Sequence, residues 1–190
     1  MKKIFLIIYF LLFVFCLKAQ MSQRRIGMGI DYLSLDLPDD MVFSPNINYQ
    51  KQFNKRLFIS TKMGYVNYSG KDSFSQSIPE NRKRIMLDIR PSFAVLKYKS
   101  NYFKIGAGPS FWYRDDDLVK QIRFSLDSPN QIIEYKKIMT KEVNVGLSLY
   151  SEIDIAIIKK ISIVGSFGFS TFKKVGSNSI LGITTLYNFK

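Results

Sequence analysis

The sequence predicts an all-β fold, an eight-stranded antiparallel up-and-down transmembrane β-barrel. Apolar and polar residues alternate with a period of two in eight stretches, short and long connections take turns between them, and the polar faces are rich in Gly and Ser with few charges. Alternation with period two is typical of strands that have one apolar and one polar face. Eight such strands with no helix between them should close into a barrel, because closure leaves no unpaired edge.

The first three strands lie in the N-terminal third of the chain. They are expected at 26–36, 42–53 and 56–68. A modest polar connection, Pro38-Asp39-Asp40, separates the first two, and the pair Asn54-Lys55 makes a tight turn before the third. Pro, Asn and Asp favour turns, so both boundaries have a chemical basis.

The alternating faces are plainest in the remaining five strands. These strands are expected at 84–96, 102–113, 141–157, 161–172 and 179–189. In the third of these, Val145, Leu147 and Leu149 share one face, while Asn144 and Ser148 share the other. Successive side chains of a strand point to opposite faces, so each strand presents one apolar and one polar surface.

The connections differ systematically in length. Tight turns are expected at 54–55, 97–101 and 159–160, and the longer polar connections lie at 38–40, 69–83, 114–140 and 173–178. Short and long connections that alternate along the chain fall at opposite ends of an up-and-down meander. All the long connections therefore share one end of the barrel.

The polar faces indicate the interior of a membrane barrel. Their charged residues form the predicted lumen charge network: Asp31, Lys62, Arg84, Asp88, Arg90, Lys104, Glu142, Glu152 and Asp154. Five acids against four bases are nearly neutral, as expected where buried ions pair with each other. A soluble lipocalin-like carrier of an apolar ligand is the inside-out alternative, with its apolar face toward the axis. Transmembrane barrels instead turn the apolar face to lipid.

Aromatic and basic residues mark the strand ends. Eight aromatics are expected in interfacial girdles: Tyr49, Tyr65, Tyr68, Tyr102, Trp112, Tyr113, Tyr187 and Phe189. The tight turns and their flanks carry seven bases and no acid: Lys51, Lys55, Arg56, Lys97, Lys99, Lys159 and Lys160. Such side chains reach toward anionic head groups at a membrane boundary, or simply suit turns, and the sequence leaves both interpretations open.

Residues 1–19 have the pattern of a secretory signal peptide. Lys2 and Lys3 precede an uncharged run from Ile4 to Leu17, and Ala19 ends the segment. A membrane-spanning helix would need about 20 apolar residues. Cleavage would leave 20–190 as the barrel domain.

Composition argues against most enzyme classes. The 190 residues include no histidine, which removes the commonest general base and metal ligand, and the single cysteine lies in the leader. We therefore expect no catalytic, cofactor-binding or metal-binding residues. Asp115, Asp116 and Asp117 are expected in a solvated acidic turn, with a cation site as the minor alternative. Despite a net charge of +13, no nucleic-acid partner is expected, because the bases do not gather on one face with aromatics.

The last predicted strand, Leu181 to Phe189, resembles the terminal signal of small eight-stranded outer-membrane barrels of Gram-negative bacteria. The chain is similar to outer-membrane protein A/X-type and porT-like barrels, although Lys190 follows the usual terminal aromatic. The resemblance implies a location in the bacterial outer membrane and contact with outer-membrane lipid. It also implies recognition of Tyr187 and Phe189 by the barrel-assembly machinery.

Segment 114–141 is predicted to form a hairpin that protrudes beyond the membrane. Its apolar positions would contact a surface protein or a glycolipid: Ile122, Phe124, Leu126, Ile132 and Tyr135. Exposed strand backbone can pair with a partner strand. The alternative is a mobile loop without a specific role.

The function expected from these features is non-enzymatic. The chain should be a porin-like integral barrel with a plugged polar lumen, acting in membrane integrity or surface interaction through its long loops. Besides the lipocalin-like carrier, a histidine-independent lipid-modifying outer-membrane enzyme is the second alternative.

Overall fold

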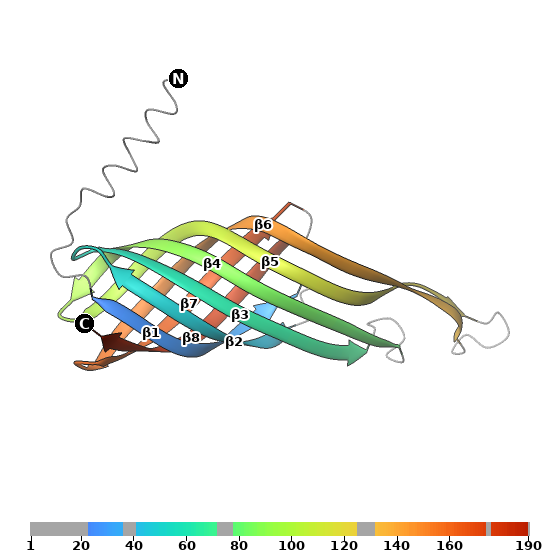
Figure 1. Ribbon diagram of the computed structural model, residues 1–190, viewed down its shortest axis with the longest axis horizontal. Helices are drawn as coiled ribbons and strands as arrows, with labels where there is room; N and C mark the ends of the chain where they lie inside the picture. The colour runs from blue at the N-terminus through green and yellow to red at the C-terminus, as the bar shows by residue number, and fades with distance from the viewer. Residues whose placement is uncertain (1–22, 36–40, 72–77, 125–131, 174–175, 190) are drawn as a thin grey trace, which may run out of the picture.

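A computed structural model describes residues 23–35, 41–71, 78–124, 132–173 and 176–189. Within these ranges eight strands form one closed barrel (Figure 1). The strands are β1 (Arg24–Ser34), β2 (Met41–Gln52), β3 (Leu57–Lys71), β4 (Pro79–Tyr98), β5 (Asn101–Phe124), β6 (Ile132–Ile158), β7 (Ile161–Phe172) and β8 (Gly176–Phe189). Each strand pairs antiparallel with its sequence neighbours, and β1 closes the ring against β8. The predicted fold class is confirmed. The predicted signal peptide, 1–19, lies outside the described residues.

The two ends of the barrel differ as predicted. At the end that we call the turn end, β4 joins β5 and β6 joins β7 through two-residue turns, and β1 begins beside the end of β8, where Arg24 pairs with Phe189. At the opposite end, the loop end, β5 and β6 extend well beyond the other strands (Figure 1). Lys99 adopts a φ of +53° in the β4–β5 turn, a left-handed conformation that is common in two-residue hairpin turns.

Strands β4, β5 and β6 are longer than their alternation predicted. Much of the segments 69–83 and 114–140, expected as polar connections, is strand. Apolar residues alternate only where one face meets lipid, so the pattern fades beyond that belt while backbone pairing continues. Asp115, Asp116 and Asp117 accordingly lie in β5, paired with Lys83, Arg82 and Asn81 of β4, and the predicted acidic turn is wrong.

Apolar side chains point away from the barrel axis. Burial alternates residue by residue along β2, β7 and most of β4, and most of the apolar side chains occupy the exposed positions. Leu147 is 65% exposed, and Ile89 and Phe167 are also exposed, whereas Asp88 and Glu152 are buried. This orientation confirms the membrane-barrel prediction and is the reverse of a lipocalin-like carrier. Among the described residues, no helix is long and apolar enough to span a membrane.

The interior nonetheless holds apolar side chains that residue type alone did not reveal. Near the loop end a buried apolar layer crosses the lumen, formed by Leu33, Leu35, Val42, Val66, Met86, Trp112, Phe172 and Ile180. Trp112 was predicted for an outer girdle and is instead 1% exposed, packed against Phe172 with ring centroids 4.8 Å apart. Its even position in β5 points it inward together with Lys104 and Ser110.

Two further girdle predictions are corrected for the same reason. Tyr68 packs against the apolar layer, and Tyr102 meets the buried ring of Phe58 edge-on, with centroids 5.1 Å apart. The other five aromatics predicted for the girdles are exposed on the outer surface: Tyr49, Tyr65, Tyr113, Tyr187 and Phe189.

Candidate functional site

The lumen of the barrel is filled by ion pairs arranged in three groups along its axis. In the group nearest the turn end, Asp154 accepts from Arg25 at 2.7 Å and from Lys104 at 3.2 Å. Lys104 also pairs with Glu152 at 2.8 Å. Both cations lie over the ring of Phe58, the Arg25 guanidinium carbon at 5.7 Å and the Lys104 Nζ at 5.0 Å. Each buried charge therefore has a partner of opposite sign.

The middle group contains two ion pairs. Lys62 Nζ contacts Asp31 at 2.5 Å, and Arg90 donates to Asp88 at 2.6 Å. The Ser110 hydroxyl donates to the same Asp88 carboxylate at 2.5 Å. These five side chains are all at least 95% buried, a setting in which an unpaired ion would be costly.

Beyond the apolar layer, a third group closes the loop end. Asp116 is fully buried and accepts from Arg84 at 3.0 Å and from Arg114 at 2.7 Å. Arg114 also lies 3.9 Å from Glu142. Farther out, a pair between Arg82 and Glu80 at 3.3 Å adds to the group, and Glu80 accepts from the Val119 backbone N–H at 2.9 Å.

The structure brings together all nine charged residues of the predicted lumen network. It adds five that sequence reasoning missed, Arg25, Glu80, Arg82, Arg114 and Asp116. Among the residues that the structure describes, the lumen network now holds seven bases and seven acids, each within 4 Å of an opposite charge. Their inward positions follow the period of two, so continuing that period a few residues farther along β4 and β5 would have found four of them.

Glycines make room for the network. A Cβ added at Gly182 would collide with Asp31 Oδ1, and one at Gly106 would lie 2.5 Å from the Tyr150 hydroxyl. That hydroxyl donates to the Pro91 carbonyl at 2.8 Å, and the ring centroid lies 5.1 Å from the Arg90 guanidinium carbon. The small residues on the polar faces therefore admit the long charged side chains of neighbouring strands.

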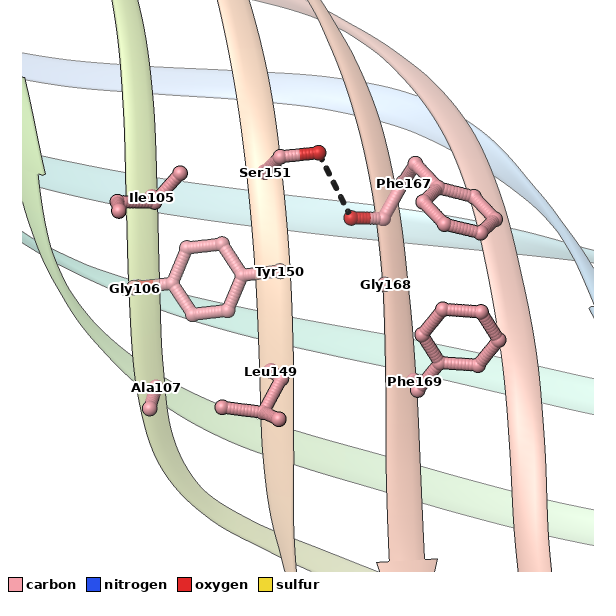
Figure 2. A pocket seen from close by; sticks show the side chains of 9 residues that line it. All are labelled: Ile105, Gly106, Ala107, Leu149, Tyr150, Ser151, Phe167, Gly168 and Phe169. Carbon is pink, nitrogen blue, oxygen red and sulfur yellow. Dashed lines mark hydrogen bonds between the residues drawn. The ribbon is translucent and has the colours of Figure 1, made fainter. Parts of the chain in front are cut away.

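The outer wall carries a hollow of about 530 Å³ over β5, β6 and β7 (Figure 2). Gly106 and Gly168 flank the Tyr150 ring at its floor, and Leu149, Phe167 and other apolar side chains surround it. The Ser151 hydroxyl donates to the Phe167 carbonyl at 3.5 Å. No carboxylate, lysine or arginine lines this hollow, so it offers no acid–base pair for catalysis.

Across the described part of the chain, no group of three or more acidic, histidine or cysteine side chains could hold a metal ion. The three neighbouring carboxylates in β5 are separated by the strand geometry. Asp116 points into the lumen, while Asp115 and Asp117 pair on the outside with Lys141 and Lys137, at 3.6 and 3.1 Å.

The predicted hairpin is a continuation of β5 and β6 outside the barrel. Ile122 pairs with the half-exposed Tyr135, and the backbone of Phe124 pairs with that of Ile132. Leu126 lies outside the described residues. Asp117 is the last residue of β5 that pairs with β4, and Gly146 is the first residue of β6 that pairs with β7. Within the described residues, 118–124 and 132–145 thus have a strand neighbour on one side only.

The predicted assembly signal lies on the outer surface of β8. Tyr187 is 45% and Phe189 36% exposed, next to Ile26 and Arg24 of β1. Both rings are therefore accessible at the turn end.

Comparison with solved structures supports the fold. A major outer membrane protein from Thermus thermophilus matches with a TM-score of 0.59 and 10% identity, over 90% of this chain and 100% of that chain. Neisserial surface protein A matches with a TM-score of 0.58 and 11% identity, over 88% and 97%. The outer membrane protein OprG from Pseudomonas aeruginosa matches with a TM-score of 0.56 and 9% identity, over 91% and 98%. No protein-family model matches the sequence, and no curated protein does.

Proposed function

We propose that this chain is an integral, non-enzymatic barrel of the bacterial outer membrane that acts through its protruding hairpin while its lumen stays closed. The outward apolar belt supports the membrane location, as does the fold that the chain shares with outer-membrane barrels. The turn end faces the periplasm and the loop end the cell exterior. The observation that carries the closed lumen is the buried apolar layer, which lies between two groups of buried ion pairs.

Several features favour a non-enzymatic role over a lipid-modifying enzyme. The chain has no histidine, and every charge of the lumen network is already paired. The outer hollow has only Ser151 and Tyr150 as hydroxyl groups, and each is hydrogen-bonded to a backbone carbonyl. Catalysis by a serine requires an adjacent base, and none lines this hollow. Incubation with labelled lipid A or phospholipid that yields a product would contradict this assignment.

Whether the lumen is plugged can be tested directly by measuring ion conductance through the barrel in planar bilayers. The purified barrel should show little stable conductance, because an eight-stranded interior is filled by side chains and here includes a buried apolar layer around Trp112 and Phe172. Single-channel current recording checks this, with a large porin inserted in the same bilayers as the control for detection. Large, steady conductance steps from the purified chain would show that the lumen is open.

The hairpin supports the surface-interaction part of the proposal. Its free strand edges expose backbone donors and acceptors that an extended partner segment could pair with. Tyr135, Met139 and Val143 add exposed apolar surface along β6. An extended segment of a surface protein fits these edges directly, and a surface glycolipid is the alternative partner.

Deleting 118–137 and joining Asp117 to Ile138 by an Asn-Gly turn should abolish binding to a surface partner but leave the barrel intact. Within the described residues, 118–124 and 132–137 pair mainly with each other. Their other contacts are the pairing of Leu118 with Ile138, the ion pair of Lys137 with Asp117, and hydrogen bonds to Pro79 and Glu80. Binding of barrel-bearing vesicles to cells or to purified lipopolysaccharide measures the loss, and heat-modifiable gel mobility reports assembly. Arg123→Gln is the matched control, because it removes only an exposed ion pair. Binding retained by the deletion would refute the hairpin's role.

A further inference from the structure

The turn end of the barrel carries a rim of exposed or partly exposed basic side chains. The rim consists of Arg24, Lys51, Lys55, Arg56, Lys97, Lys99, Lys159 and Lys160. On the outer surface of this end, the described residues include no carboxylate: Glu152 and Asp154 point inward, where they pair with Lys104 and Arg25. The charges of the lumen ion pairs therefore cancel each other, whereas the positive charge of the rim is not balanced by carboxylates on the same surface.

A pocket of about 400 Å³ opens within this rim between the β4–β5 and β6–β7 turns. Lys99 and Lys159 stand at its two sides, and its other polar groups include Arg25, Asn101, Tyr102 and Ser162. Because Arg25 is neutralised by Asp154 at 2.7 Å, the two lysines give the pocket its net charge. Two exposed ammonium groups beside amide and hydroxyl groups form a site suited to a phosphate-type anion.

Exposed apolar side chains border the same pocket. Ile157 and Ile158 line it and are 58% and 57% exposed, and Leu96 and Tyr98 at the end of β4 are still more exposed. Lys99 lies over the Tyr98 ring, its Nζ 5.4 Å from the centroid, so cation and apolar surface adjoin. A ligand that fills both parts must be an amphiphile with an anionic head.

We propose that this pocket binds the phosphodiester head group of an anionic phospholipid in the leaflet at the turn end, with the acyl chains lying along Ile157 and Ile158. The site rests on the proposed membrane insertion of the barrel. The position of the lysines at the edge of the apolar belt favours a lipid over a soluble anion, since only a lipid would use the apolar border.

The test compares lipid retention by the full-length barrel in nanodiscs that contain equal amounts of phosphatidylglycerol and phosphatidylcholine. Native mass spectrometry after release should show preferential retention of phosphatidylglycerol. Lys99→Gln with Lys159→Gln should reduce that preference about fivefold for each lysine removed. Lys120→Gln with Lys136→Gln removes the same charge from exposed positions on the protruding hairpin and should leave the preference unchanged.

Three results would overturn the site. The first is an unchanged lipid preference in the Lys99/Lys159 variant, and the second is an equal loss of preference in the Lys120/Lys136 variant. The third is displacement of the lipid by soluble glycerol phosphate, which would indicate a site for soluble anions. Heat-modifiable gel mobility in the same samples distinguishes failure of the lipid site from failure of the proposed membrane insertion. If the shift is absent, the barrel has not inserted; if it is present, the lipid result concerns the pocket alone.

Discussion

Replacing Arg90 by Met is expected to lower the free energy of unfolding by about 3–5 kcal/mol, the cost of leaving a buried charge without its partner. Arg90 is 3% exposed and donates to Asp88, itself 4% exposed, at 2.6 Å. In the variant, Asp88 would keep only the Ser110 hydroxyl as a hydrogen-bond partner. Urea unfolding in detergent micelles measures the change, and the single tryptophan, Trp112, supplies the fluorescence signal.

Two controls separate the lost pair from general disturbance of the lumen. The double variant Asp88→Leu with Arg90→Met removes both charges and should recover most of the stability, since apolar replacement of a whole buried pair is often neutral. Arg123→Met breaks a pair whose side chains are 80% and 66% exposed, and its effect should stay within about 1 kcal/mol. An Arg90→Met barrel as stable as the native one would mean that water already solvates Asp88.

The barrel architecture could be predicted from sequence because lipid imposes a simple rule on every strand. Wherever a strand crosses the apolar belt, one residue in two must be apolar, as Leu147 and Leu149 are, and the residue between them is free to be polar. The same rule located the nine charged residues of the predicted network. Turn length then distinguished the two ends.

This rule does not apply where the strands extend beyond the lipid bilayer. Glu80, Arg82 and Asp116 lie toward the loop end, where polar residues occur on both faces and no alternation of apolar residues marks the strand. Their burial depends on neighbouring strands that continue the barrel wall above the belt. A single sequence does not reveal that register, so Asp116 was expected in a solvated turn.

Trp112 illustrates a second limit. An aromatic residue near a strand end is equally suited to a lipid interface and to filling a narrow lumen, and only its parity relative to Lys104 and Ser110 decides between them. Residue type alone therefore does not predict the apolar layer that includes Trp112, although this layer does much to close the lumen.

The same tryptophan predicts a large spectroscopic contrast between the two faces of β5. Trp112 is 1% exposed inside the lumen, and its sequence neighbour Tyr113 is 41% exposed on the outer wall at nearly the same depth. Bromine atoms on lipid acyl chains quench tryptophan only at short range, so they should report which face meets lipid. The native chain and the Trp112→Phe with Tyr113→Trp variant each contain one tryptophan and differ only in the face that carries it.

Quenching by brominated phosphatidylcholine in vesicles is therefore the most direct measurement of side-chain orientation. We expect the tryptophan fluorescence of the double variant, in which the indole replaces the Tyr113 side chain, to be strongly quenched. The fluorescence of native Trp112 should change little. Equal quenching of the two proteins, or stronger quenching of native Trp112, would contradict a barrel whose apolar side chains face lipid around a filled interior.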